Sequence, residues 1–272
     1  MGFMQFFKRK GAGAKLGLAL GSGGAKGMAH LGALKAFEEA GIAFDVVSGA
    51  SIGSIVGALY AYGYSSTDMF ELVKSLDFGE YTRLIMLRLD GNGLAVALEK
   101  FLGGVQDFED LKLPFAAVAT DPETGAARTI REGSLSTALA ASSAMPPFFR
   151  AVAIDGKKYI DGAFSDAMPA SVCRALGADY VVGVDLSAFS AGTDPRPLLE
   201  KLYPGNKIDP AAAREKGRRA ADIVIDPKLE GYRATNIGAI DEMYELGYDA
   251  AREKIPQILA AAEEAIPRPR RN

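Results

Sequence analysis

The sequence predicts an α/β fold with a largely parallel sheet. Short apolar runs alternate with segments of helical periodicity, which is the order that successive strand–helix units produce. Hydrophobic residues make up 49% of the 272-residue chain and charged residues 24%, as is typical of a soluble globular protein. The 31 glycines cluster, which indicates tight turns where backbone segments approach closely.

The first half of the chain predicts two strand–loop–helix units. Apolar runs bounded by glycine predict the strands, and apolar residues three or four positions apart predict the helices. The expected elements are a strand over residues 16–20, a glycine-rich loop over 21–27, a helix from Met28 that stops at Gly41, a strand over 45–48 and a helix over 51–62.

The second half continues the pattern after an irregular helical region. Residues 65–105 are expected to form a helical cap, within which Leu84–Ile85–Met86–Leu87 either lines an acyl pocket or belongs to the core. Strands are expected over 115–120 and 180–185, an edge strand over 221–225, and a helix over 236–265 with a break near Pro256. This divides the chain into a basic arm (1–14), a single domain (15–265) and a basic tail (266–272).

The charge distribution argues against nucleic acid as a partner. Both ends are basic and carry no acid, through Lys8, Arg9, Lys10, Lys15, Arg268, Arg270 and Arg271. Removing these seven positive charges from the net charge of −3 leaves −10 for residues 16–266. Binding to nucleic acid needs Lys and Arg clustered on one face, which so acidic a body does not offer.

Several features favour a cytoplasmic protein, with peripheral contact at the inner face of the membrane as an open alternative. Cys173 is the single cysteine, which excludes an intramolecular disulfide. Phe6 and Phe7 are followed directly by basic residues rather than by a secretory apolar segment. Together with Phe3 they form either an interfacial anchor or an unstructured start. Residues 46–67 carry no charge, but their glycines favour a buried strand–turn–helix over a membrane span.

Gly49-Ala50-Ser51-Ile52-Gly53 has the form G-x-S-x-G, directly after a predicted strand and before a predicted helix. A serine at such a sharp turn has a strained backbone that exposes its hydroxyl at a helix N-terminus. Glycine is needed two residues to either side because side chains there would meet neighbouring backbone. Ser51 is therefore the candidate nucleophile, and the alternative is a glycine-rich helix start packed under the sheet.

The loop from Gly21 to Gly27 could bind an anion through its backbone N–H groups. It does not fit a phosphate loop, because Lys26-Gly27 reverses the required Gly-Lys order. It does not fit a dinucleotide fingerprint either, because Lys26 stands where the third glycine is needed. An oxyanion hole or a purely structural turn remains.

The base is the open question. His30 is the only histidine and precedes Ser51, which does not suit the usual order Ser, acid, His. Either His30 acts in an unusual order or a carboxylate is the base, and a packing or hydrogen-bonding role is favoured for His30. Asp161, at the end of a predicted strand and followed by Gly162, is the candidate carboxylate, and the alternative from spacing alone is a turn residue. Such a base works better when burial raises its pKa.

These features together resemble the patatin-like phospholipase family, particularly its small bacterial members. The resemblance covers roughly residues 15–255 and includes the segments ATDPETG at 119–125 and ASSAMP at 141–146. It implies a three-layer α/β/α sandwich with Ser51 as nucleophile, Asp161 as base and no catalytic histidine. It also implies an oxyanion hole formed by amides around Gly23 and Gly24, together with Lys26. The motif residues that carry it are Gly21, Gly27, Gly49, Gly53 and Gly162.

The resemblance further implies acyl esters of lipids as substrates, with no cofactor and no catalytic metal. Lys26 stands where the family usually has a basic residue, whereas Ser22 departs from a common glycine. We therefore expect a phospholipase A or lysophospholipase type of activity. The alternatives are a general carboxylesterase or thioesterase, and a non-catalytic lipid-binding regulatory module. Retention of both Ser51 and Asp161 argues against the last.

Overall fold

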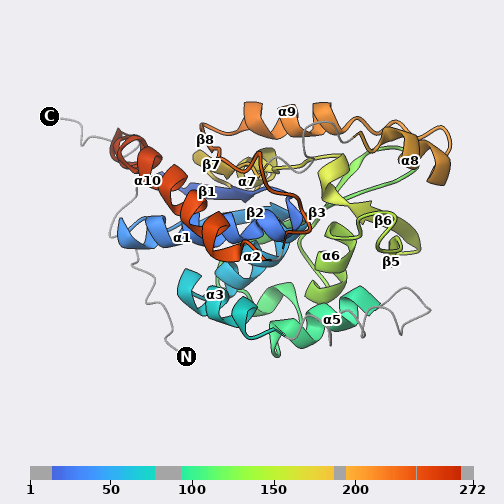
Figure 1. Cartoon of the computed structure of the whole chain (residues 1–272), viewed down its shortest axis with the longest axis horizontal. Coiled ribbons are helices and arrows are strands. Elements are labelled where there is room, and N and C mark those ends of the chain that lie inside the picture. Colours follow the sequence, from blue (N-terminus) through green and yellow to red (C-terminus); the bar gives the residue numbers. More distant parts are fainter. Residues whose placement is uncertain (1–13, 77–92, 187–193, 237, 265–272) are drawn as a thin grey trace, which may run out of the picture.

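In the computed structural model, a mostly parallel sheet lies between two layers of helices (Figure 1). The structure describes residues 14–76, 93–186, 194–236 and 238–264. The strands that pair in parallel lie in the order β3 (Phe115–Thr120), β2 (Val46–Ala50), β1 (Leu16–Leu20), β7 (Tyr180–Val184) and β8 (Ile223–Ile225). The predicted α/β fold with a largely parallel sheet is confirmed, and β8 is the expected edge strand.

Antiparallel strands extend the sheet beyond β3. They are β4 (Ala127–Ile130), β5 (Val152–Ile154) and β6 (Lys157–Asp161). Sequence reasoning missed β4 and β5. Three of the four β4 residues are exposed and β5 has only three residues, so neither makes an apolar run.

One edge of β3 serves two strands in succession. Val118 pairs with Ala50 of β2 and also with β4, so β2 and β4 take opposite edges of β3. Ala119, the next residue, pairs with Asp161 of β6 and again with β4. β6 therefore pairs with the same edge of β3 as β2 does, beyond the point where β2 ends. This brings Asp161 to the point where the chain turns away after Ala50, at Ser51.

The alternating side chains of β1 show the two faces of the sheet. Leu16, Leu18 and Leu20 belong to the larger hydrophobic core, whereas Ala19 packs in a smaller one on the other face. The first face is covered by α1 (Met28–Glu39), α2 (Ile52–Tyr62) and α10 (Ile240–Glu264). The second is covered by α7 (Ala170–Ala175) and α9 (Pro210–Ala220). These are the layers of the expected α/β/α sandwich.

Further helices and 3-10 turns complete the described part. The helices are α3 (Ser66–Lys74), α5 (Gly93–Leu102), α6 (Leu135–Ser142) and α8 (Arg196–Leu202). Among them, α6 is buried against β3 and β6. The turns are η1 (Gly24–Gly27), η2 (Phe108–Asp110) and η3 (Gly162–Phe164). α3 and α5 lie in the region expected to form a cap, on the same side of the sheet as α2 (Figure 1).

The expected break near Pro256 is wrong, because α10 runs through it to Glu264. A proline in a helix removes one hydrogen bond to the carbonyl four residues earlier, here that of Arg252. Both residues are exposed, so water can satisfy that carbonyl. The strand expected over 45–48 runs from Val46 to Ala50, and the helix expected from 236 begins at Ile240.

Some predictions fall outside the described residues. These concern the aromatic and basic N-terminal arm, the run Leu84–Leu87 and the basic tail. The uncharged stretch 46–67 does form a buried strand, turn and helix, as expected. Across the described ranges, the structure contains no helix whose length and apolarity would suffice to cross a membrane.

Candidate active site

Ser51 occupies the sharp turn between β2 and α2, at the carboxyl end of its strand. Its backbone has φ 53° and ψ −128°, a conformation that a residue with a side chain rarely adopts. Buried hydrogen bonds hold it. The Ser51 N–H donates to Ser142 Oγ over 2.9 Å, and that hydroxyl donates to the Val118 carbonyl over 2.7 Å. Ser142 and the end of β3 thus fix the turn.

The two glycines of the G-x-S-x-G pattern are required by close backbone contacts. A Cβ on Gly49 would lie 2.3 Å from the carbonyl oxygen of Gly53. A Cβ on Gly53 would lie 2.2 Å from the carbonyl oxygen of Leu20. Any side chain at either position would collide with main chain that cannot move away. The predicted reason for both glycines is confirmed.

Asp161 ends β6 and faces Ser51. Its Oδ2 accepts a 2.7 Å hydrogen bond from Ser51 Oγ, and its Oδ1 accepts one of 2.9 Å from the Ala163 N–H. The carboxylate is fully buried. A Cβ on Gly162 would lie 2.2 Å from the Val118 carbonyl oxygen, so glycine is needed for this approach. The structure thus brings the two residues predicted for catalysis into direct contact.

Burial changes the acidity of this carboxyl. It raises the pKa of Asp161 from 3.8 to about 7, while the hydrogen bonds from Ala163 and Ser51 partly oppose the rise. A carboxylate with a pKa near neutrality is a much stronger base than an exposed aspartate. The site therefore supplies the raised pKa that a Ser–Asp arrangement needs.

The glycine-rich loop between β1 and α1 presents two unused N–H groups. Neighbouring N–H groups donate within the protein, namely those of Gly21, Ser22, Ala25 and Lys26. Among the described residues, the N–H groups of Gly23 and Gly24 find no acceptor. Gly24 has φ +58°, and a Cβ there would lie 2.5 Å from the Ala234 carbonyl oxygen. Two adjacent backbone donors without an acceptor are the kind of groups that an oxyanion hole uses.

The other two loop glycines are also held by close contacts. A Cβ on Gly21 would lie 2.9 Å from the Val184 carbonyl oxygen. A Cβ on Gly27 would lie 2.3 Å from the side chain of Ile52, the residue after Ser51. Glycine at Gly27 therefore lets the loop pack directly against the start of α2.

His30 supports the glycine loop. It is fully buried, and its Nε2–H donates a 2.7 Å hydrogen bond to the Gly21 carbonyl oxygen. Burial lowers the pKa of His30 to about 4, so the imidazole is neutral at pH 7. The favoured hydrogen-bonding role is what the structure shows.

Lys26, the third residue predicted for the oxyanion hole, is buried at the glycine loop. Its N–H donates to the Gly23 carbonyl over 3.3 Å, and its side chain is 2% exposed. Burial lowers the pKa of its ammonium, and the charge of Asp185 opposes this. The Lys26 N–H is thus engaged within the loop, and the loop N–H groups without an acceptor among the described residues are those of Gly23 and Gly24.

An apolar pocket of about 320 Å³ adjoins these groups. Two of its lining residues belong to the candidate site or adjoin it: Gly24 of the loop, and Ile52, which follows Ser51. The rest of the lining comes from Ala25, Met28, Ile55, Val73, Leu76, Leu94, Ala97, Leu98, Phe101, Ala234 and Ile240. Sequence reasoning missed this pocket, although four of these residues repeat at helical spacing in α5, at Leu94, Ala97, Leu98 and Phe101.

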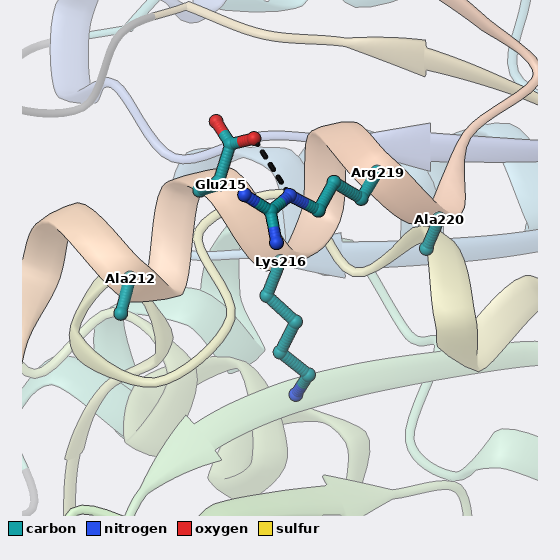
Figure 2. Close-up of a pocket in the computed structure, with 5 residues that line it drawn as sticks. All are labelled: Ala212, Glu215, Lys216, Arg219 and Ala220. Atoms are coloured by element: carbon teal, nitrogen blue, oxygen red, sulfur yellow. Dashed lines mark hydrogen bonds and ion pairs between the residues drawn. The ribbon is translucent and has the colours of Figure 1, made fainter.

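A hollow over α9 offers no comparable site. Figure 2 shows that its lining side chains come from this single helix and that Glu215 pairs with Arg219. Lys216 Nζ lies 2.8 Å from an oxygen of Asp166. The charged groups of the hollow are thus engaged in ion pairs, and they do not converge on a common point.

The fold and site define an α/β protein with a strained serine at the carboxyl end of a parallel strand, hydrogen-bonded to a buried aspartate. The patatin-like phospholipase family model matches residues 18–174, more than half of the chain. The chain belongs to this family.

Curated relatives are longer than this chain. It is 29% identical over 280 residues to patatin-like phospholipase domain-containing protein 6 of Mus musculus, covering 87% of this chain and 20% of that protein. It is 34% identical over 184 residues to an uncharacterized NTE family protein of Mycobacterium bovis, covering 65% and 51%. The chain thus spans between a fifth and about half of these relatives.

Solved structures share the fold at low identity. VipD from Legionella pneumophila superposes with a TM-score of 0.54 at 15% identity, covering 90% of this chain and 67% of that one. Human GIVD cytosolic phospholipase A2, in complex with methyl gamma-linolenyl fluorophosphonate, gives 0.51 at 13%, covering 93% and 59%.

Proposed function

We propose that this protein is a lipid acyl hydrolase that cleaves acyl esters of phospholipids or lysophospholipids through Ser51 and Asp161. The observation that carries the proposal is the buried 2.7 Å hydrogen bond between Ser51 Oγ and Asp161 Oδ2. The apolar pocket beside Gly24 and Ile52 supports an acyl chain as the group that is bound. Membership of a phospholipase family supports the lipid ester.

In the first step, Ser51 Oγ attacks the carbonyl carbon of the ester, and its proton passes to Asp161 Oδ2. The N–H groups of Gly23 and Gly24 donate to the oxyanion that develops on the carbonyl oxygen. The bond between the carbonyl carbon and the alcohol oxygen then breaks. Asp161 returns the proton to the departing alcohol, and the acyl group remains esterified to Ser51.

In the second step, water takes the place of the alcohol. Asp161 accepts a proton from the water as its oxygen attacks the acyl-enzyme, and the same N–H groups stabilise the oxyanion. Ser51 leaves with the proton from Asp161, which releases a fatty acid and restores the starting pair. His30 takes no part, because it is neutral and bound to the loop.

The test is release of fatty acid from phospholipids, lysophospholipids and short p-nitrophenyl esters. Ser51→Ala removes the nucleophile and is expected to lower kcat by more than about 10⁴-fold. Asp161→Asn removes the base and is expected to lower kcat by about 10²–10⁴-fold. A fluorophosphonate should label the wild type on Ser51 and fail to label Ser51→Ala.

Matched variants away from the site serve as controls. Ser171→Ala changes a serine on α7, and Asp155→Asn changes an aspartate whose side chain is 83% exposed. Both should keep wild-type activity. Labelling that persists in Ser51→Ala would show that Ser51 is not the nucleophile. Cleavage of short esters only would contradict a lipid as the substrate. No cleavage at all by a folded wild type would favour a non-catalytic lipid-binding module.

A further inference from the structure

The apolar pocket has a size and composition that select among acyl chains. Among the described residues, its lining contains no charged or hydrogen-bonding side chain, so this lining does not suit a lipid head group. In liquid water each molecule occupies about 30 Å³, and a methylene group is of similar size. A pocket of about 320 Å³ then holds roughly ten carbons of one chain.

We propose that this pocket selects the length of the acyl chain and acts as a ruler set for a single chain of about ten carbons. Ala97 and Phe101 of α5 set this length. The inference rests on the proposed function, since it names the acyl group that the same site receives. The alcohol side of the ester stays outside the pocket.

The arrangement of the walls gives the chain its direction. Gly24 and Ile52 adjoin the candidate oxyanion donors and the nucleophile, so the carbonyl end of the chain lies there. The remaining walls come from α1, α2, the end of α3, α5 and the start of α10. Figure 1 places α3 and α5 on the side of α2, away from α7 and α9. The chain therefore extends from Ser51 between the helices of the first face.

Ala97 and Phe101 are suited to set the length because of their sizes and spacing. They are one turn apart on α5 and lie on the same face of that helix. Ala97 is 3% exposed and has the shortest side chain that α5 contributes to the pocket, so a larger residue there would take volume from it. Phe101 is half-buried and has the largest, so shortening it would add volume.

The experiment measures kcat/KM for a series of p-nitrophenyl esters from four to sixteen carbons. Each methylene group buried in an apolar site favours binding by about fourfold. For the wild type, kcat/KM should rise about fourfold per methylene up to roughly ten carbons and then level or fall. Ala97→Leu adds three carbon atoms to the wall and should move the maximum to chains about three carbons shorter.

Phe101→Ala should move the maximum in the opposite direction, to chains up to about six carbons longer. Phe101→Leu is the milder variant and should give a smaller shift, in case the alanine variant does not fold. Ala260→Leu is the matched control, because it makes the same change at an exposed position near the far end of α10. It should leave the maximum where it is.

Binding without catalysis separates this inference from the proposed function. The same pocket variants are made in a Ser51→Ala background, and binding of saturated fatty acids of graded length is measured by calorimetry. If wild type cleaves no ester, the proposed function fails, and the binding series alone decides on the ruler. A preferred length that shifts with Ala97→Leu and Phe101→Ala supports the ruler. A maximum that stays fixed in all pocket variants overturns it.

Discussion

Replacing Asp161 with asparagine should change how the stability of the protein depends on pH. In the folded protein, burial raises the pKa of this carboxyl from 3.8 to about 7. Between these values the unfolded chain has released the proton while the folded chain still holds it. The unfolded state then binds fewer protons, so the free energy of unfolding falls as pH rises through this window.

The size of the effect follows from the shift. About 3 pKa units at 1.36 kcal/mol each amount to about 4 kcal/mol. The wild type therefore loses roughly this much stability from Asp161 between about pH 4 and pH 8. Asp161→Asn has no proton to lose. Its free energy of unfolding should gain about 4 kcal/mol relative to wild type over the same range.

The comparison must be made as a difference because His30 acts in the opposite direction. Burial lowers the pKa of His30 from 6.5 to about 4, so the unfolded chain binds more protons in that window and stability rises with pH. In wild type the two effects largely cancel between about pH 4 and 6.5. Subtracting the free energy of unfolding of the wild type from that of Asp161→Asn cancels the contribution of His30 and leaves that of Asp161.

Urea unfolding of both proteins at intervals from pH 4 to pH 8 measures this difference. The expected difference grows toward high pH and levels off above about pH 7 to 8. A difference that stays constant within about 1 kcal/mol, the uncertainty of such extrapolations, would refute the reasoning. It would mean that the Asp161 carboxyl has an ordinary pKa and is not the buried base of the proposed mechanism.

Two further predictions follow from the same contacts. If ionised Asp161 is the base, kcat/KM should rise with pH, with the slope expected for loss of a single proton, and reach a plateau above about pH 7. Asp161→Asn should lack this rise. A rise in kcat/KM that persists in the variant would assign the titration to another group. Ser142→Ala should leave the Ser51 N–H and the Val118 carbonyl unpaired, at a cost in urea unfolding of about 1–3 kcal/mol for each. The control Ser171→Ala removes only one long hydrogen bond, 3.5 Å to Asp166 Oδ2, and should cost about 1 kcal/mol or less. Equal losses in the two variants would count against the special role of Ser142.

Local patterns in the sequence were sufficient to predict the α/β fold of this protein and most strands of its parallel sheet. The apolar runs that became β1, β3 and β7 are fully or almost fully buried, so they lack polar interruptions that would disguise them. The G-x-S-x-G pattern predicted both the turn at Ser51 and the need for its glycines. The strands that escaped prediction, β4 and β5, are short or exposed and owe their pairing to β3 and β6.

The contacts around the candidate catalytic residues show what local sequence patterns do not predict. Ser142 and Asp161 follow Ser51 by 91 and 110 residues, and nothing in their local sequence states that they reach it. The order of the strands decides this, because β6 continues along the edge of β3 that β2 leaves. The raised pKa of Asp161 also depends on burial by residues from several elements, so it has no local signature.

The sequence by itself determined the class of fold, the turn at Ser51 and the glycines that this turn requires. These features depend on the periodicity of apolar residues and on steric contacts between residues close together in the chain. It also confined the base to His30 or a carboxylate, since the chain has a single histidine. The resemblance to the patatin-like family then pointed to Asp161. Only the tertiary structure showed that Asp161 contacts Ser51 while His30 binds the glycine loop, that Lys26 is buried, and that residues of α3 and α5 line an apolar pocket beside Ser51. Each of these depends on contacts between residues far apart in the chain, which are fixed by packing rather than by local pattern.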